Sequence, residues 1–238
     1  MANRLGLGLD QPPYTASADY AALAPEARAV LDCWFGTPDA PDFGVARKLW
    51  FSRDKAFDAM LLERFGTLID AAREGSLDHW KETPLGALAL IVVLDQFSRN
   101  CHRNTPRAFA ADQKALHTAQ QMVASGADRL LPTAHHRAFA YLPFEHDETL
   151  ASQQESLRLF KVLEAEPGGA SYYSFAVRHA KVIERLGAFR IATHCWGVLR
   201  RMKKTPFCAN PARRSRRSDA LFAARVCGAG RRPHEHPQ

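Results

Sequence analysis

The stretch LGALALIVVLDQFSRNCHRNTPRAFAADQKAL, residues 85–116, decides the fold of this chain. Its first ten residues are apolar on every side, a pattern that predicts a buried central helix. The next ten positions form a polar elbow (residues 95–104), and its polar and charged residues include Asp95, Gln96, Arg99, Asn100, His102, Arg103 and Asn104. A second helix is predicted from Thr105 and Pro106 onward, because a hydroxyl precedes a proline at the first helical position. Such an elbow is either a hydrogen-bonded structural corner or the floor of a binding site.

Length and composition indicate a soluble globular protein. The chain has 238 residues, of which 46% are hydrophobic and 24% charged, enough for one sizeable domain with a buried core. The longest apolar run, residues 85–94, is about half of what a membrane helix needs. The first twenty residues hold one arginine and no sustained apolar segment, so no signal peptide is expected. We therefore expect a cytoplasmic protein without a membrane partner.

The usual motifs of cofactor and metal chemistry are missing. The five cysteines, at positions 33, 101, 195, 208 and 227, show no metal-ligand spacing and are expected to be free thiols. The sequence has no phosphate-binding loop, no dinucleotide-binding glycine pattern, no HExxH and no GxSxG. We accordingly predict neither a cofactor nor a metal ion.

The positive charge is confined to the end of the chain. The net charge is +7, but residues 190–238 hold 12 basic and 2 acidic residues, which leaves 20 basic and 23 acidic residues before them. The mildly acidic body offers no basic face, so a nucleic-acid partner is not favoured. The rival interpretation is a genuine basic tail that grips nucleic acid.

Apolar residues recur at helical spacing through most of the chain. Helices are predicted at 25–35, 54–73, from 83 into the elbow, and at 105–124, 132–142, 148–164 and 171–186, with Pro143 expected to break the fifth of them. Short links and the lack of a strand pattern predict an all-α protein built from antiparallel helical hairpins.

Several stretches resemble one bacterial family. They are VLDCWFG (30–36), LALIVVLDQFSRNCHRNTPRAFAAD (88–112), FAYLPFEHDE (139–148) and YSFAVRHAKVIERLG (173–187). Their motifs D-Q-F-x-R-N and L-P-F-x-H resemble those of the family catalogued as domain of unknown function 924. The resemblance implies a tetratricopeptide-like α-α superhelix, and it brings no activity, since the family has none assigned.

The resemblance stops near residue 190. The family continues with a segment that resembles G-R-F-P-H-R-N, whereas this chain reads GAFRIATHC (187–195). Phe-Arg-Ile-Ala can be encoded TTC CGC ATC GCA, and one restored cytosine gives Phe-Pro-His-Arg. Our hypothesis is a single-base deletion near codon 190, which resequencing of that codon tests. The predicted organisation is a flexible N-terminal arm (1–22), a helical domain (23–189) and a disordered, out-of-frame tail (190–238).

The elbow allows two interpretations. Asp95 and Arg99 stand four residues apart, so they can form a salt bridge that fastens the helix end to its neighbours. In the functional interpretation, Arg99, Arg103 and Asn100 surround an anionic ligand, because guanidinium groups match carboxylate and phosphate.

Two further segments carry candidate chemistry. Glu145 and His146 follow Pro143 at a helix junction, where they could act as acid–base groups or metal ligands, or the neighbouring acids could simply stabilise the next helix. His179 on the last helix could be a structural residue or a second wall of the site. We expect the elbow, this junction and the last helix to lie together.

The sequence thus predicts a binding module for a small anionic ligand or a peptide segment. The predicted ligand-binding residues are Asp95, Gln96, Arg99, Asn100, Arg103, Glu145, His146 and His179. The alternative is an enzyme that uses Glu145 and His146 as acid–base groups or metal ligands while Arg99 and Arg103 hold an anionic substrate. A fully paired ionic cluster would favour a structural or partner-binding role.

Overall fold

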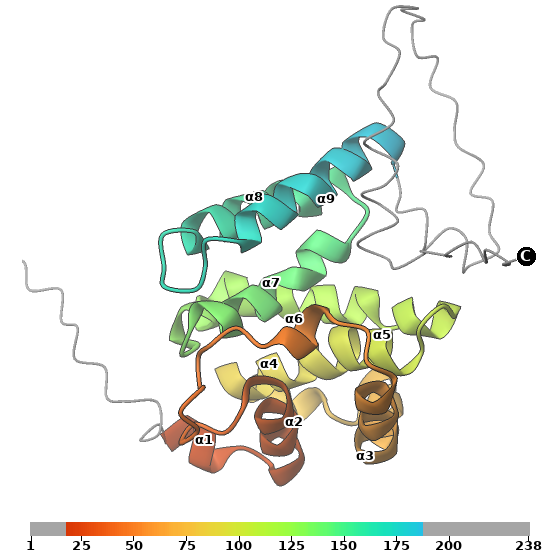
Figure 1. Ribbon diagram of the computed structural model, residues 1–238, viewed down its shortest axis with the longest axis vertical. Helices are drawn as coiled ribbons and strands as arrows, with labels where there is room; N and C mark the ends of the chain where they lie inside the picture. The colour runs from red at the N-terminus through yellow and green to blue at the C-terminus, as the bar shows by residue number, and fades with distance from the viewer. Residues whose placement is uncertain (1–17, 188–238) are drawn as a thin grey trace, which may run out of the picture. The chain divides into compact units, whose positions relative to one another are not determined.

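The central helix α4 (Pro84–Ile91) is the best-buried helix in the fold. In the computed structural model, which describes residues 18–187, every α4 residue from Leu85 to Ile91 is buried. The hydroxyl of Thr83 caps its first turn by accepting a hydrogen bond from the Gly86 amide at 3.1 Å. The helices α2 (Pro25–Phe35), α6 (Asp112–Ser125) and α7 (Ala134–His146) pack against α4 (Figure 1).

The regular elements of the described residues are all helices, with no strand among them. The remaining elements are α1 (Ala18–Ala22), α3 (Lys55–Glu74), α5 (Ser98–Cys101), α8 (Leu150–Leu163), α9 (Tyr172–Leu186), the short 3-10 helices η2 (Lys48–Phe51), η3 (Asp78–Glu82), η5 (Pro106–Phe109) and η6 (Ala127–Leu130), and η4 (Val92–Phe97), a π-helical segment. The predicted all-α class is confirmed.

Helix ends follow the local sequence closely. Helix α2 begins at Pro25 and ends before Gly36, and the carboxylate of Asp54 caps α3 by accepting from the Ala56 and Phe57 amides. Proline at a first helical turn and glycine after a last turn are favourable because neither disrupts the helical hydrogen bonds.

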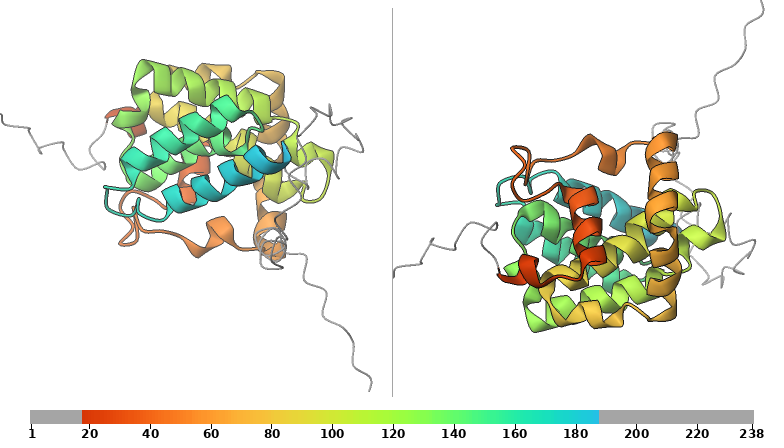
Figure 2. Two further views of the ribbon diagram at one scale, coloured as in Figure 1. Left: turned by 90° about the horizontal axis from the view of Figure 1, so that it is seen from above. Right: turned by 90° about the horizontal axis from the view of Figure 1, so that it is seen from below.

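The later helices form successive hairpins. Helix α8 packs on α7 and lies side by side with α9, to which a short loop connects it, as the left view of Figure 2 shows. The Thr149 hydroxyl caps α8 by accepting from the Ser152 amide at 3.2 Å. Helix α9 packs on α8 and also contacts both ends of α7, where Tyr172 meets His135 and His179 meets Glu145.

Aromatic side chains in the core connect α2 with α7 and with the π-helical segment. The Trp34 ring from α2 meets Phe139 of α7 at 5.4 Å and Phe97 of the π-helical segment at 5.7 Å, both in edge-to-face geometry. Such pairs stabilise a core beyond the area they bury. The polar elbow therefore lies next to a well-packed part of the core, since Phe97 is itself one of the elbow residues.

Two sequence predictions about helix ends were wrong. Pro143 lies inside α7, which continues to His146, because the helix is buried on its neighbours and tolerates one missing hydrogen bond. Thr105 does not cap a long helix: its hydroxyl donates to the His102 carbonyl at 2.8 Å, a 3-10 turn follows, and α6 begins only at Asp112.

The structure covers only part of the predicted domain organisation, whose limits stay predictions. Helix α1 occupies the last residues of the predicted N-terminal arm. The predicted tail, 190–238, and residues 1–17 of the arm lie outside the described residues. Within the described range, no helix combines the length and the apolar character that spanning a membrane requires.

Candidate functional site

A π-helical segment connects the apolar helix to the elbow. From Val92 to Phe97 the backbone winds more widely than an α-helix, and the Ser98 amide and hydroxyl both donate to the Val93 carbonyl, five residues back. A π-helical turn rotates the residues after it relative to an α-helix, and such turns are frequent at functional sites. Here the turn carries Asp95, whose side chain is buried.

Asp95 is a buried carboxylate with three side-chain partners. Its Oδ1 accepts from Arg99 Nη1 at 2.7 Å and meets His146 Nδ1 at 2.8 Å, while Oδ2 accepts from the Gln96 amide. Burial by itself raises the pKa of Asp95, but the charges of Arg99 and His146 and these hydrogen bonds outweigh it and hold the pKa at about 2. Asp95 is therefore ionised at neutral pH.

Arg99 joins the elbow to α6. Its guanidinium donates two parallel hydrogen bonds to Asp112, at 2.9 and 3.0 Å, and a further one to the Asp95 carbonyl at 3.0 Å. It also lies over the Phe109 ring, 5.5 Å from the centroid. Two carboxylates thus neutralise Arg99, so an incoming anion would have to displace Asp112.

Glu145 and His179 form a second acid–imidazole pair. His179 Nδ1 lies 2.7 Å from Glu145 Oε1, and the carboxylate is almost fully buried while the imidazole is one-quarter exposed. Burial lowers the pKa of His179, but the hydrogen bond and charge of Glu145 outweigh that effect and raise it overall. His179 is therefore a cation over a wider pH range than an ordinary histidine.

The adjacent residues Glu145 and His146 thus belong to different pairs. His146 faces Asp95 and Glu145 faces His179, so the two do not act as one acid–base couple. Gln153 holds this end of α7, since its amide donates to the carbonyls of Glu145 and Asp147 at 2.9 and 2.6 Å.

The other predicted residues lie beside this cluster. Arg103 is paired with Asp58 of α3 by two hydrogen bonds, at 2.6 and 2.9 Å. Asn100 is buried on α5. The expected meeting of the elbow, the Pro143 junction and the last helix is found, because Asp95 touches α7 and Glu145 touches α9.

Sequence reasoning missed three partners, Asp112, Asp58 and Gln153. The only signal for the two acids was their position in the first turn of a helix, which is common for capping reasons alone. Gln153 carried no local signal. No group of three or more histidine, cysteine or acidic residues suited to a metal ion occurs within residues 18–187.

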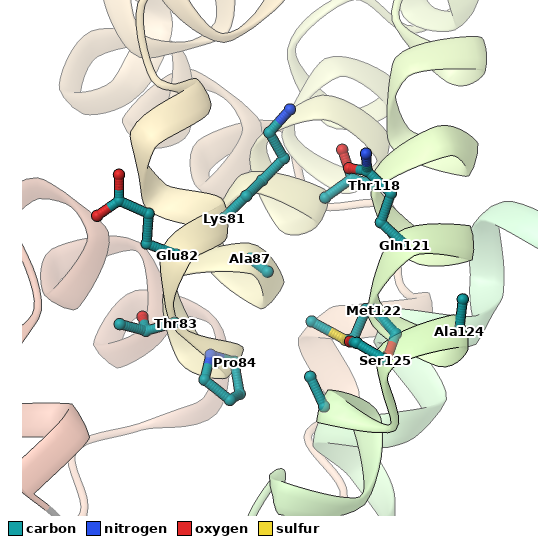
Figure 3. Close-up of a pocket in the computed structure, with 11 residues that line it drawn as sticks. Lys81, Glu82, Thr83, Pro84, Ala87, Thr118, Gln121, Met122, Ala124 and Ser125 are labelled. Carbon is teal, nitrogen blue, oxygen red and sulfur yellow. The ribbon is translucent and has the colours of Figure 1, made fainter.

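A pocket of about 700 Å³ lies elsewhere, between the start of α4 and the second half of α6 (Figure 3). In that view Lys81, Thr118 and Gln121 stand at one end of the pocket, with Pro84, Met122 and Ser125 at the other. None of the predicted ligand-binding residues lines it.

In this all-helical fold two buried carboxylates, Asp95 and Glu145, each contact a histidine. The model of the family described as "Bacterial protein of unknown function (DUF924)" matches residues 30–194, and the chain belongs to that family. The match ends close to the predicted frame change at codon 190.

One solved structure is similar to this chain. It is the "Structure of Protein of Unknown Function ATU0120 from Agrobacterium tumefaciens", which is 34% identical, with a TM-score of 0.62. The similarity covers 71% of this chain and 89% of that one. A comparison with curated proteins finds no match.

Proposed function

We propose that this protein is a binding module whose ligand is a carboxylate, carried by a small molecule or a peptide, at the surface formed by His146 and His179. The observation that carries the proposal is the arrangement of the two acid–imidazole pairs. Each carboxylate is buried and each imidazole is partly exposed, so both rings can be reached from solvent. The two acids orient the rings before any ligand arrives, which reduces the entropy cost of binding.

His146 is the first contact residue in this proposal. Its Nδ1 is engaged by Asp95, and the ring makes no other hydrogen bond or ion pair to a residue within 18–187, so Nε2 can meet a ligand. His179 adds positive charge, since its pKa is raised. Arg99 and Arg103 are assigned a structural role, because acids of the protein already neutralise them.

Isothermal titration calorimetry with succinate tests the proposal. We expect binding to be stronger near pH 6 than near pH 8, because His179 loses its proton as the pH rises through its raised pKa. The variants H146Q and H179Q should each weaken binding by about tenfold, the effect of one charge-assisted hydrogen bond. His117, an exposed histidine on α6, supplies the control variant H117Q, which should bind as the wild type does.

The alternative function is acid–base catalysis by His146, with Asp95 as the orienting acid. The specific observation in its favour is the short Asp95–His146 contact, the arrangement that positions a general base. Turnover of p-nitrophenyl acetate that H146Q abolishes and H117Q retains would favour this enzyme. Equal succinate binding by wild type, H146Q and H179Q would contradict the binding proposal.

A further inference from the structure

A second pocket, of about 350 Å³, opens between η6, α7 and α8. Its polar lining consists of Asp128, Arg129, Arg137, Tyr141 and Arg158, and it shares no residue with the His146 and His179 surface. Ligand pockets start at roughly 300 Å³, so this one suits a small molecule.

Asp128 supplies a buried carboxylate oxygen without a partner. The residue is 5% exposed, and its Oδ2 accepts from the Tyr141 hydroxyl at 2.6 Å. Its Oδ1 is buried and has no hydrogen bond to any residue in the described part of the chain. Buried polar atoms in native proteins nearly always have a partner, so this oxygen is expected to accept a hydrogen bond from a ligand.

Three arginines, Arg129, Arg137 and Arg158, line the same pocket. Arg129 is exposed, and its guanidinium group has no hydrogen bond or ion pair to the described residues. Arg158 is paired with Glu155, its neighbour on the surface of α8, and Arg137 is paired with Glu166 while its Nε is buried and without a partner. Exposed pairs such as Arg158–Glu155 contribute little to stability, so a ligand can compete for Arg158.

We propose that this pocket binds a small oxyanion that also carries a hydrogen-bond donor, such as a hydroxylated phosphate monoester or carboxylate. The oxyanion lies between Arg129 and Arg158, whose guanidinium groups match its oxygens. The donor of the ligand, a hydroxyl or amine, completes the hydrogen bonding of Asp128 Oδ1. The combination of a cationic rim and one unpaired acceptor selects such a ligand over a simple anion.

Calorimetric titration of the full chain with three probes tests this inference. The probes are glycerol 3-phosphate, glycerate and propyl phosphate, and the last lacks any hydroxyl donor. We expect glycerol 3-phosphate, glycerate or both to bind at least about tenfold more tightly than propyl phosphate, because only they can donate to Asp128. The tighter of the two hydroxylated probes tells whether the oxyanion is a phosphate or a carboxylate.

Surface arginine variants locate the binding. R129Q and R158Q should each weaken binding of the hydroxylated probe by about tenfold. Arg73 on α3 forms a similar exposed ion pair three residues from Asp70, so R73Q is the matched control for R158Q and should bind as the wild type does. Because both pocket arginines are exposed, the folded state should survive their replacement.

The variant D128N addresses selectivity. An asparagine can still accept from Tyr141 while it presents an amide donor to the ligand, so the preference for hydroxylated probes should disappear. Three results would overturn the inference: no probe binds at millimolar concentration, R129Q and R158Q bind as the wild type does, or propyl phosphate binds as tightly as both hydroxylated probes. The arginine variants decide the matter even where D128N fails to fold.

Discussion

At the scale of single residues, Arg99 holds the elbow together. It neutralises the buried Asp95 and the half-buried Asp112 at once, and neither acid has another guanidinium within hydrogen-bond distance in the described residues. Removing one member of a buried ionic cluster leaves an uncompensated charge in a medium of low dielectric constant, which costs far more than loss of an exposed pair.

Replacing Arg99 by methionine should therefore destabilise the protein by roughly 3–5 kcal/mol. The side chain keeps its aliphatic length and loses only its charge and donors. Urea unfolding, followed by circular dichroism, measures the change. The control is R107M, which breaks the exposed Arg107–Asp70 pair and should cost less than about 1 kcal/mol. Equal losses in the two variants would contradict a special role for Arg99.

His136 gives the protein an acid-sensitive core. The ring is buried, stacks on Phe35 at 4.0 Å and contacts the Thr133 hydroxyl. Burial lowers its pKa from 6.5 to about 3, so the folded protein keeps the ring neutral where the unfolded chain protonates it. The unfolded state thus binds more protons between those values, and the free energy of unfolding falls as the pH drops.

We expect the variant H136F to remove that dependence. Between about pH 4 and pH 6 the wild type should lose up to about 1.4 kcal/mol of stability per pH unit more than H136F does. Denaturant unfolding at several pH values measures both slopes. The exposed His117 provides the control, since H117F should keep the wild-type slope. Parallel slopes for wild type and H136F would show that His136 is not buried as a neutral ring.

At the scale of elements, the junction between η3 and α4 depends on a close backbone approach. A Cβ atom at Gly86 would lie 2.2 Å from the Trp80 carbonyl oxygen and 2.8 Å from Thr83 Oγ1. The same glycine donates its amide to the Thr83 cap. A side chain there would push η3 away from the first turn of the central helix.

The variant G86A should accordingly destabilise the fold by about 1–3 kcal/mol, as overpacking does. Gly66 on α3 offers the matched control, because a Cβ there would meet only the flexible Leu62 side chain at 3.4 Å. G66A should leave stability unchanged or raise it by up to about 1 kcal/mol through helix propensity. Thermal unfolding of the two variants compares them. A stable G86A would show that η3 moves freely relative to α4.

At the scale of the whole molecule, local chemistry predicted the elements better than the contacts between them. The start of α2 at Pro25 and its end before Gly36 follow from backbone preferences alone. Pro143 shows the limit, because tertiary burial kept α7 helical where local preference predicted a break. The π-helical turn at η4 was not predicted, since no residue preference marks it in a run of apolar residues.

In the candidate site, too, the sequence predicted the contact within one helix but not the contacts between helices. The Asp95–Arg99 pair followed from its four-residue spacing and is confirmed. The contacts of Asp95 with His146, 51 residues away, and of Arg99 with Asp112, 13 residues away, depend on how helices pack. Spacing within one helix cannot supply them. The sequence predicted that these segments lie together, but it did not show that His146 contacts Asp95 while Glu145 contacts His179.

The contact between Glu145 and His179 also makes the stability of α9 depend on that of α7. If α9 detached, Glu145 on α7 would lose its imidazole partner, one residue from the imidazole that contacts Asp95. Detachment of α9 therefore costs free energy through the loss of this contact. We expect α7 and α9 to open together as one cooperative unit.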